Sequence, residues 1–412
     1  VGVVVVDTTN TAQVTGSSTL GAGSLAVTAT TTHTLDTHSL AAAFGALGAE
    51  ASIAILIDNA TTTASIDGMT IATSRAVVVL ATDQRTANTK ADGASFGGVA
   101  VGVSAAAVNL GGSVTASLHN ASIGTSGSRA GSVTVSASSR NSAKTSALAA
   151  SGGLGLAAQG SDAEANTTTL VSALADGATI YASGAVSIAG SAAGRASADA
   201  TGFALAGIVA AGGSFAHANV AEQVATTVGG HSLIDAGSIS IAAAVTPDTT
   251  TPAVDASATG SSGAMVGLTA TESKATNSSS AKTLAENSTL TASGLVAVTA
   301  TTATSQHASA SGFAGGLLAA GANVAQADST IVTTALFSDM TGVTGGNVDL
   351  HATGTDTNVA DAVSGSGGLI AGAAADASTN SVSTTRAAAN TSSSAAKYLI
   401  SALGGTVDVA AT

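Results

Sequence analysis

Ser132-Val-Thr-Val-Ser-Ala137 and Gly237-Ser-Ile-Ser-Ile-Ala242 carry the pattern that decides the fold. In both segments apolar and polar residues alternate with a period of two, which points the branched side chains to one face of a β-strand. Val and Thr favour strands, and the chain is poor in Leu, Glu, Lys and Arg, which favour helices. The sequence therefore predicts an all-β protein.

The strand motif, of the form Gly-x-Val-x-Val-x-Ala, returns along the whole chain at spacings of 52 to 59 residues. Strands repeated in this way bury their apolar faces by stacking along one axis. The predicted fold is a parallel β-solenoid (β-helix) built from repeats of about 54 residues. The first apolar residues of the motif are Leu25, Val77, Val133, Val186, Ile239, Val296, Val348 and Val407.

These positions make residues 1–412 a single continuous array, with a partial repeat 1–24, repeats starting near 25, 77, 133, 186, 239, 296 and 348, and a partial repeat 407–412. Because the array starts within a repeat and Val1 is no initiator Met, we expect an excerpt of a longer chain. A Gly-rich apolar segment follows each motif, and it comes latest where Thr246 to Pro252 holds both prolines. Proline removes a backbone donor, so an inserted loop at a corner of the solenoid is expected there.

Two arrangements of one repeat remain open, namely one wide turn or three small rungs of about 18 residues. The Val-x-Val motif does not recur at a half or a third of the period, which favours one wide turn. Val133 and Val186 should then be direct neighbours, about 4.8 Å apart, whereas three rungs would separate them by roughly 14 Å. A β-propeller is disfavoured because its blades need antiparallel hairpins.

Polar residues 17 to 20 positions before the next strand motif predict a structural ladder, in which side-chain amides of successive turns bond along the axis. The ladder candidates are Asn59, Asn166, Asn219, Asn277, Asp328 and Asn390. A similar, interrupted stack of rings is predicted for Phe44, Phe96, Phe203 and Phe313.

Composition excludes several partners and chemistries. Only 8% of residues are charged, and 11 basic residues face 24 acidic ones, so nothing here could neutralise a row of phosphates and no nucleic acid is expected as a partner. The absence of cysteine excludes disulfides, thiolate zinc sites and a Cys nucleophile. No apolar run is long enough for a helical transmembrane segment.

Catalytic, cofactor and metal sites are not expected either, so the chain is predicted not to be an enzyme. No G-x-S-x-G elbow lies where a strand meets a helix, and no glycine pair is followed by Gly-Lys-Ser/Thr. His33 and His38 are five apart, which places them on opposite faces of a strand. The histidines share no repeat position; they are His33, His38, His119, His217, His231, His307 and His351.

Strands such as Ala130-Gly-Ser-Val-Thr-Val-Ser-Ala137, alternating with Ala/Gly-rich segments, resemble the repeats of very large secreted bacterial surface proteins. Filamentous-haemagglutinin-like and autotransporter-type adhesins are the similar group. The resemblance covers the whole chain and rests on composition and repeat style. It implies a parallel β-helix, export from a Gram-negative cell and a secreted, cell-surface location, and it brings no catalytic residues.

Together these features predict a structural segment of an extracellular filament, biofilm matrix or surface fibre, which self-associates end to end or laterally. A cell-surface adhesin that binds a glycan or host ligand is the alternative. An ice-binding or polysaccharide-active protein is a further alternative, because Thr tracts such as Thr28 to Thr34 resemble flat Thr arrays. That array fades at Ser136 to Ser139.

Overall fold

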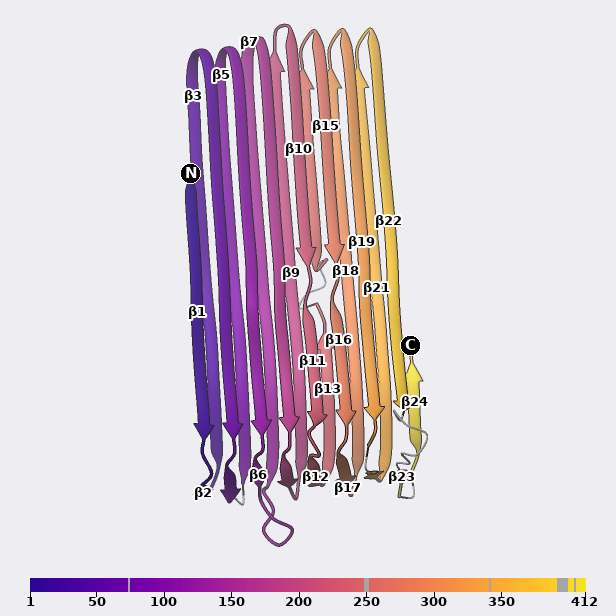
Figure 1. The fold of residues 1–412 in the computed structure, drawn as a ribbon. Coiled ribbons are helices and arrows are strands. Elements are labelled where there is room, and N and C mark those ends of the chain that lie inside the picture. The colour runs from indigo at the N-terminus through magenta and orange to yellow at the C-terminus, as the bar shows by residue number, and fades with distance from the viewer. Residues whose placement is uncertain (73–74, 248–251, 341, 391–398, 404) are drawn as a thin grey trace.

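The computed structural model describes residues 1–72, 75–247, 252–340, 342–390, 399–403 and 405–412. None of these residues is helical, and the strands form one large and one small sheet in which the pairings are parallel. Figure 1 shows two flat layers of long strands joined by turns at one end, with short strands closing the other end. The predicted parallel β-solenoid is confirmed.

Each repeat is one wide turn. Val133 pairs directly with Val186, so the prediction of one turn per repeat is confirmed and three small rungs are ruled out. The chain ascends through one layer, reverses at an apical turn, descends through the other layer and crosses a short base before the next turn (Figure 1). The eight first apolar residues of the strand motif, from Leu25 to Val407, all lie in one column along the axis.

The strands fall into four groups. Three of them run through both layers, namely β3 (Leu25–Asp67), β5 (Ala76–His119) and β7 (Ser132–Asp176). The other ascending strands are β9 (Ala185–Ala206), β13 (Ser238–Val245), β14 (Val254–Gly263), β18 (Leu295–Gly315), β21 (Asn347–Gly367) and β24 (Val407–Ala411). The other descending strands are β1 (Gly2–Thr15), β10 (Val209–Val220), β11 (Gln223–Gly229), β15 (Val266–Asn277), β16 (Ser280–Glu286), β19 (Leu318–Ser338) and β22 (Ile370–Asn390). The base strands are β2 (Thr19–Gly21), β4 (Thr70–Ala72), β6 (Ser122–Ile123), β8 (Thr179–Tyr181), β12 (Leu233–Ala236), β17 (Thr289–Ala292), β20 (Gly342–Gly345) and β23 (Leu399–Ala402).

A residue with positive φ ends each descending pass and turns the chain into the base. Only Gly, and to a lesser extent Asn and Asp, adopt this backbone conformation at low cost. The column therefore explains why these residue types return at the same corner of successive turns. Its members are Gly16, Gly68, Asn120, Gly177, Gly230, Asn287 and Asp339.

Inward side chains form three apolar clusters between the layers. The cluster nearest the base is rich in Val, Ile and Leu, and it is closed by base residues such as Ile180 and Leu290. The middle cluster consists mainly of Ala, for example Ala143 and Ala196, and the cluster near the apex is small. Small methyl side chains fill the interior at close layer separation without voids. Buried polar side chains separate the clusters.

The proline-bounded insertion lies elsewhere than predicted. It does not occupy a corner but interrupts the ascending layer, because β13 and β14 on either side of it both pair with β9 and β18. Residues 248–251 of this segment lie outside the described residues. The ascending sheet thus accommodates extra residues by letting them leave the strand, while the register resumes at Val254.

Candidate functional site

The predicted polar ladder forms in part. Asn166 and Asn219 are in register on adjacent turns, and Asp328 lies in the same outward column beyond Thr276. Thr276 Oγ1 donates to Asn219 Oδ1 at 2.9 Å, a side-chain hydrogen bond that runs along the axis. Asn109 precedes Asn166 in this column, although the sequence analysis did not include it.

The other three candidates lie in different columns. Asn59 is opposite Gly111, Asn277 is opposite Ser329, and Asn390 is opposite Ser338. Asn277 falls one residue past the column, so its side chain faces inward and is buried. The continuous six-member ladder therefore does not form, because residues gained or lost at the base change the distance from each anchor to the next strand motif.

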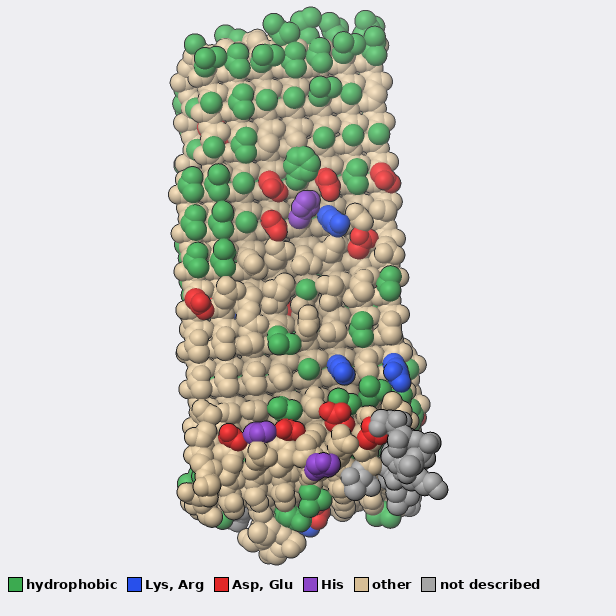
Figure 2. Space-filling view, in the orientation of Figure 1, with side chains coloured by type: hydrophobic (Ala, Val, Ile, Leu, Met, Phe, Trp, Pro, Cys, Tyr) green, Lys and Arg blue, Asp and Glu red, His purple; other side chains and the backbone are tan. Residues whose placement is uncertain are grey.

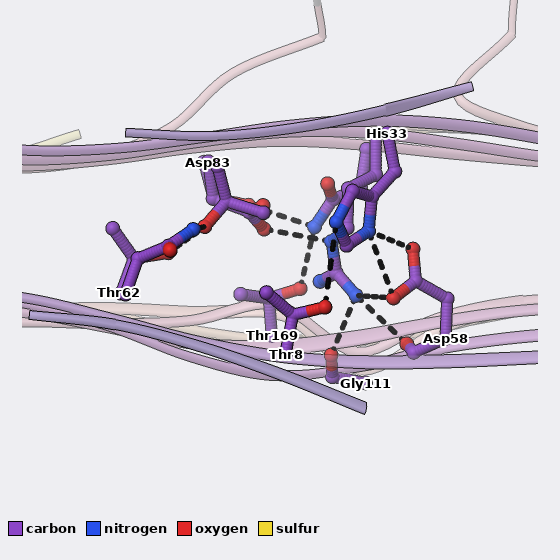
Figure 3. A network of polar contacts seen from close by, with 12 residues as sticks. Thr8, His33, Asp58, Thr62, Asp83, Gly111 and Thr169 are labelled. Atoms are coloured by element: carbon purple, nitrogen blue, oxygen red, sulfur yellow. Dashed lines mark hydrogen bonds and ion pairs between the residues drawn. The ribbon is translucent and has the colours of Figure 1, made fainter. Parts of the chain in front are cut away.

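A buried charged cluster lies between the basal and middle apolar clusters (Figure 3). Arg85 Nε donates to Asp83 Oδ2 at 2.9 Å, and Arg85 Nη1 donates to the carbonyl oxygens of Asp58 and Gly111 at 2.7 and 2.8 Å. His33 Nδ1 lies 2.9 Å from Asp58 Oδ2. The Arg85 and Asp83 side chains are fully buried, so each charge depends on its partners in the interior. Arg85 thereby links the two layers.

Burial controls the titration of this cluster. The pKa of the Asp83 carboxyl is raised because burial outweighs the attraction of Arg85. Glu222, fully buried in the same polar band, has its pKa raised to about 8, again by burial and against the opposing Arg85 charge. Gly194 lies directly against the Glu222 carboxyl, and a side chain at Gly194 would occupy its space. The band therefore holds a carboxyl that stays protonated at neutral pH.

A second polar band crosses the interior nearer the apex. Ser52, Ser104, Ser161 and Ser214 are buried and in register on successive turns. Ser52 Oγ donates to the carbonyl oxygen of Ser39 at 2.9 Å. The hydroxyls of Ser104, Ser161 and Ser214 have no hydrogen-bond partner among the described residues. Members of one column thus differ in hydrogen bonding but not in burial.

Histidines mostly pair with acids of a neighbouring turn. His33 points inward and His38 outward, as the spacing predicted. Exposed pairs of this kind contribute at most about 1 kcal/mol each. The outward pairs are His38 with Asp92 at 3.1 Å, His119 with Asp176 at 3.1 Å, His307 with Asp255 at 2.8 Å and His351 with Asp408 at 3.1 Å. Within the described ranges, no three His, Asp or Glu side chains converge into a metal-binding group.

Gly93-Ala94-Ser95-Phe96-Gly97 matches the nucleophile-elbow pattern in sequence alone. It lies inside β5, and the Ser95 side chain is buried. A nucleophile elbow needs a strand-to-helix turn that exposes the serine. Ser95 is therefore a packing residue of the second polar band.

An open pocket of about 560 Å³ lies on the ascending layer and offers both donors and acceptors. Lys90 Nζ, at its margin, lies 2.9 Å from Asp92 Oδ2. Such a mixed polar lining has the chemistry to hold hydroxyl groups of a ligand. The lining residues are Asp36, Thr37, His38, Asn88, Thr89, Lys90, Lys144, Ser146 and Asp199.

No helix among the described residues is long and apolar enough to cross a membrane. No protein-family model, curated protein or solved structure matches this chain. The argument for function therefore comes from the solenoid and its surfaces.

Proposed function

We propose that this chain is a structural segment of an extracellular filament, matrix or surface fibre, and that it has no catalytic role. The observation that carries the proposal is the single column from Leu25 to Val407, in which every turn repeats the same frame. A frame of this kind extends along the axis by adding turns, each of which contacts only its neighbours. The resemblance to secreted bacterial surface repeats supports a cell-surface or matrix location.

The width of the turn suits a scaffold. Neighbouring turns are joined by pairing along nearly the whole of both layers, as between β3 and β5. Backbone hydrogen bonds in a parallel sheet run between the strands, and here that direction is the solenoid axis. Many such bonds share an axial load at every junction between turns. The structure is thus suited to a stiff rod that resists extension.

Electron microscopy of the native material tests the proposal. We expect uniform filaments whose diffraction shows an axial spacing of about 4.8 Å, the distance between paired strands. Isolated particles without axial order, together with saturable ligand binding, would contradict the scaffold role.

A surface adhesin is the second candidate function, and the polar pocket bounded by Lys90, Lys144 and Asp199 is the observation that favours it. Binding to a glycan array, abolished by Lys90→Gln with Lys144→Gln, would support this role. Thr28→Gln with Thr30→Gln, on the same layer outside the pocket, is the matched control. Equal loss in both variants would show that the pocket is not the binding site.

A further inference from the structure

The apical third of the descending layer has an apolar outer surface, here called the apical apolar surface. Three outward columns form it, running from Leu47 to Ile370, from Ala49 to Gly372 and from Ala51 to Ala374. Every position in these columns is Gly, Ala, Val, Leu or Ile. Hydrophobic side chains gather over this end in Figure 2, and the charged side chains in that view lie below it.

The surface is large enough for a stable contact. Seven paired turns, from Leu47 to Ile370, at about 4.8 Å each and three columns at about 6.8 Å each give roughly 700 Å². A stable interface buries about 800 Å² on each partner. Exposed side chains at the apical turns, such as Leu154 and Leu369 at 85% exposure each, add to this area. Monomers rarely expose an apolar patch of this size without a partner.

We propose that the apical apolar surface pairs face to face with the same surface of a second copy of this chain. The two-fold axis runs parallel to the strands and passes over Ala211 and Gly213. This inference rests on the proposed scaffold role for its purpose, since it supplies the lateral contact of a fibre. Its geometry comes from the surface alone.

The surface is self-complementary about that axis. Leu268, which projects from the layer at 45% exposure, faces Ala158 of the copy. Val101 and Val103, at 43% and 45% exposure, face Ala320 and Ala322 of the copy. Large side chains therefore meet small ones, as an isologous two-fold contact requires. A second copy also has the same spacing between turns, so the match holds along the whole surface.

Charges below the surface favour the same alignment. Glu164 and Lys274 lie in one outward column, on either side of His217, so the two-fold axis places Glu164 of each copy opposite Lys274 of the other. Asp162 and Glu272, in the adjoining column, also face each other. Their repulsion at the rim makes the contact tighter as salt increases, whereas the apolar contact itself persists.

A lipid surface fits the same region less well. Binding to anionic membranes draws on Lys and Arg beside the apolar face. Here the first charged residues below the columns are the acids Asp162, Glu272 and Asp376, and the chain carries a net charge of −13.

Sedimentation equilibrium of the chain tests the pairing. We expect a dimer, and Ala211→Glu should weaken it at least about tenfold because it buries carboxylates at the axis. Ala189→Glu, at a small outward position on the ascending layer, is the matched control and should leave the dimer intact. Circular dichroism verifies that both variants fold. A chain that stays monomeric at about 100 μM, or equal weakening by both variants, would overturn the proposal.

A charge exchange tests the alignment. Glu164→Lys and Lys274→Glu should each weaken the dimer several-fold, and the double variant should restore it. Failure of the double variant to restore pairing would overturn the two-fold arrangement. Microscopy separates this inference from the scaffold role: single unpaired filaments would contradict only the pairing, whereas dimers that never extend into filaments would contradict only the scaffold.

Discussion

Phe44 stacks on Phe96 of the next turn, with ring centroids 5.5 Å apart and ring planes 12° from parallel. The stack ends at Gly152, the next residue in the column, where a side chain would collide with the Phe96 ring. Phe203 and Phe313 lie in a neighbouring column with Ser261 between them. The predicted ring stack is therefore real for one pair and interrupted elsewhere.

Phe96→Ala should lower the free energy of unfolding by about 0.5 to 1.5 kcal/mol more than Phe203→Ala. The two rings are similarly exposed, at 44% and 46%, so the difference isolates the contact with Phe44. Chemical denaturation of both variants measures it. Equal losses would show that the stacked geometry adds nothing to burial.

Arg85→Met should destabilise the fold by about 3 to 5 kcal/mol, because it leaves the buried carboxylates of Asp58 and Asp83 without their cation. Arg129→Met is the control. Arg129 Nη2 lies 2.6 Å from Asp235 Oδ2, but both side chains are partly exposed, so its loss should cost about 1 kcal/mol or less. Thermal unfolding of both variants decides, and similar costs would show that burial does not strengthen the Arg85 cluster.

Glu222→Gln should change how stability depends on pH. The folded pKa is about 8 against 4.5 when unfolded, so the folded state binds the proton more tightly. The stability that this group contributes is fully present below about pH 4.5 and is lost as pH rises through about 8. The variant does not titrate there, so its advantage over the parent should grow across that interval, to at most about 5 kcal/mol. Melting temperatures measured from pH 4 to 9 test this, with Glu286→Gln as the partly exposed control; parallel curves for parent and Glu222→Gln would refute it.

Ser161→Ala should be neutral or stabilising, whereas Ser52→Ala should cost about 1 kcal/mol. Both serines are buried in one column, but only Ser52 donates a hydrogen bond within the described structure. Denaturation curves for the two variants provide the measurement. An equal cost at both positions would mean that the Ser161 hydroxyl is satisfied in solution, for example by ordered water.

Periodicity made the architecture predictable, since like-on-like stacking requires equivalent residues at the full period. Val133 and Val186 are equivalent in sequence and adjacent in space. The Asn ladder was only partly predictable, because a one-residue change moves a side chain such as Asn277 to the opposite face. Spacing to the next motif does not reveal such a slip.

The Arg85 cluster was missed although the sequence contains its signal. Asp83 and Arg85 have the same parity as Val77 and Val79, so the alternation that buries the valines also turns these charges inward. The apical apolar surface was missed for a related reason. Its residues, such as those around Leu47, were taken as markers of the repeat, and sequence alone does not show that successive turns unite them on one exposed face.

The shared column has a genetic consequence. Ser132 pairs with Ala76, and Val133 pairs with both Val77 and Val186. Removal of codons 133–185 would join Ser132 to Val186 and place Val186 on Val77, with the frame unbroken. Recombination between similar gene segments could therefore shorten or lengthen the rod by whole turns, so that its length varies in inheritance while its cross-section stays constant.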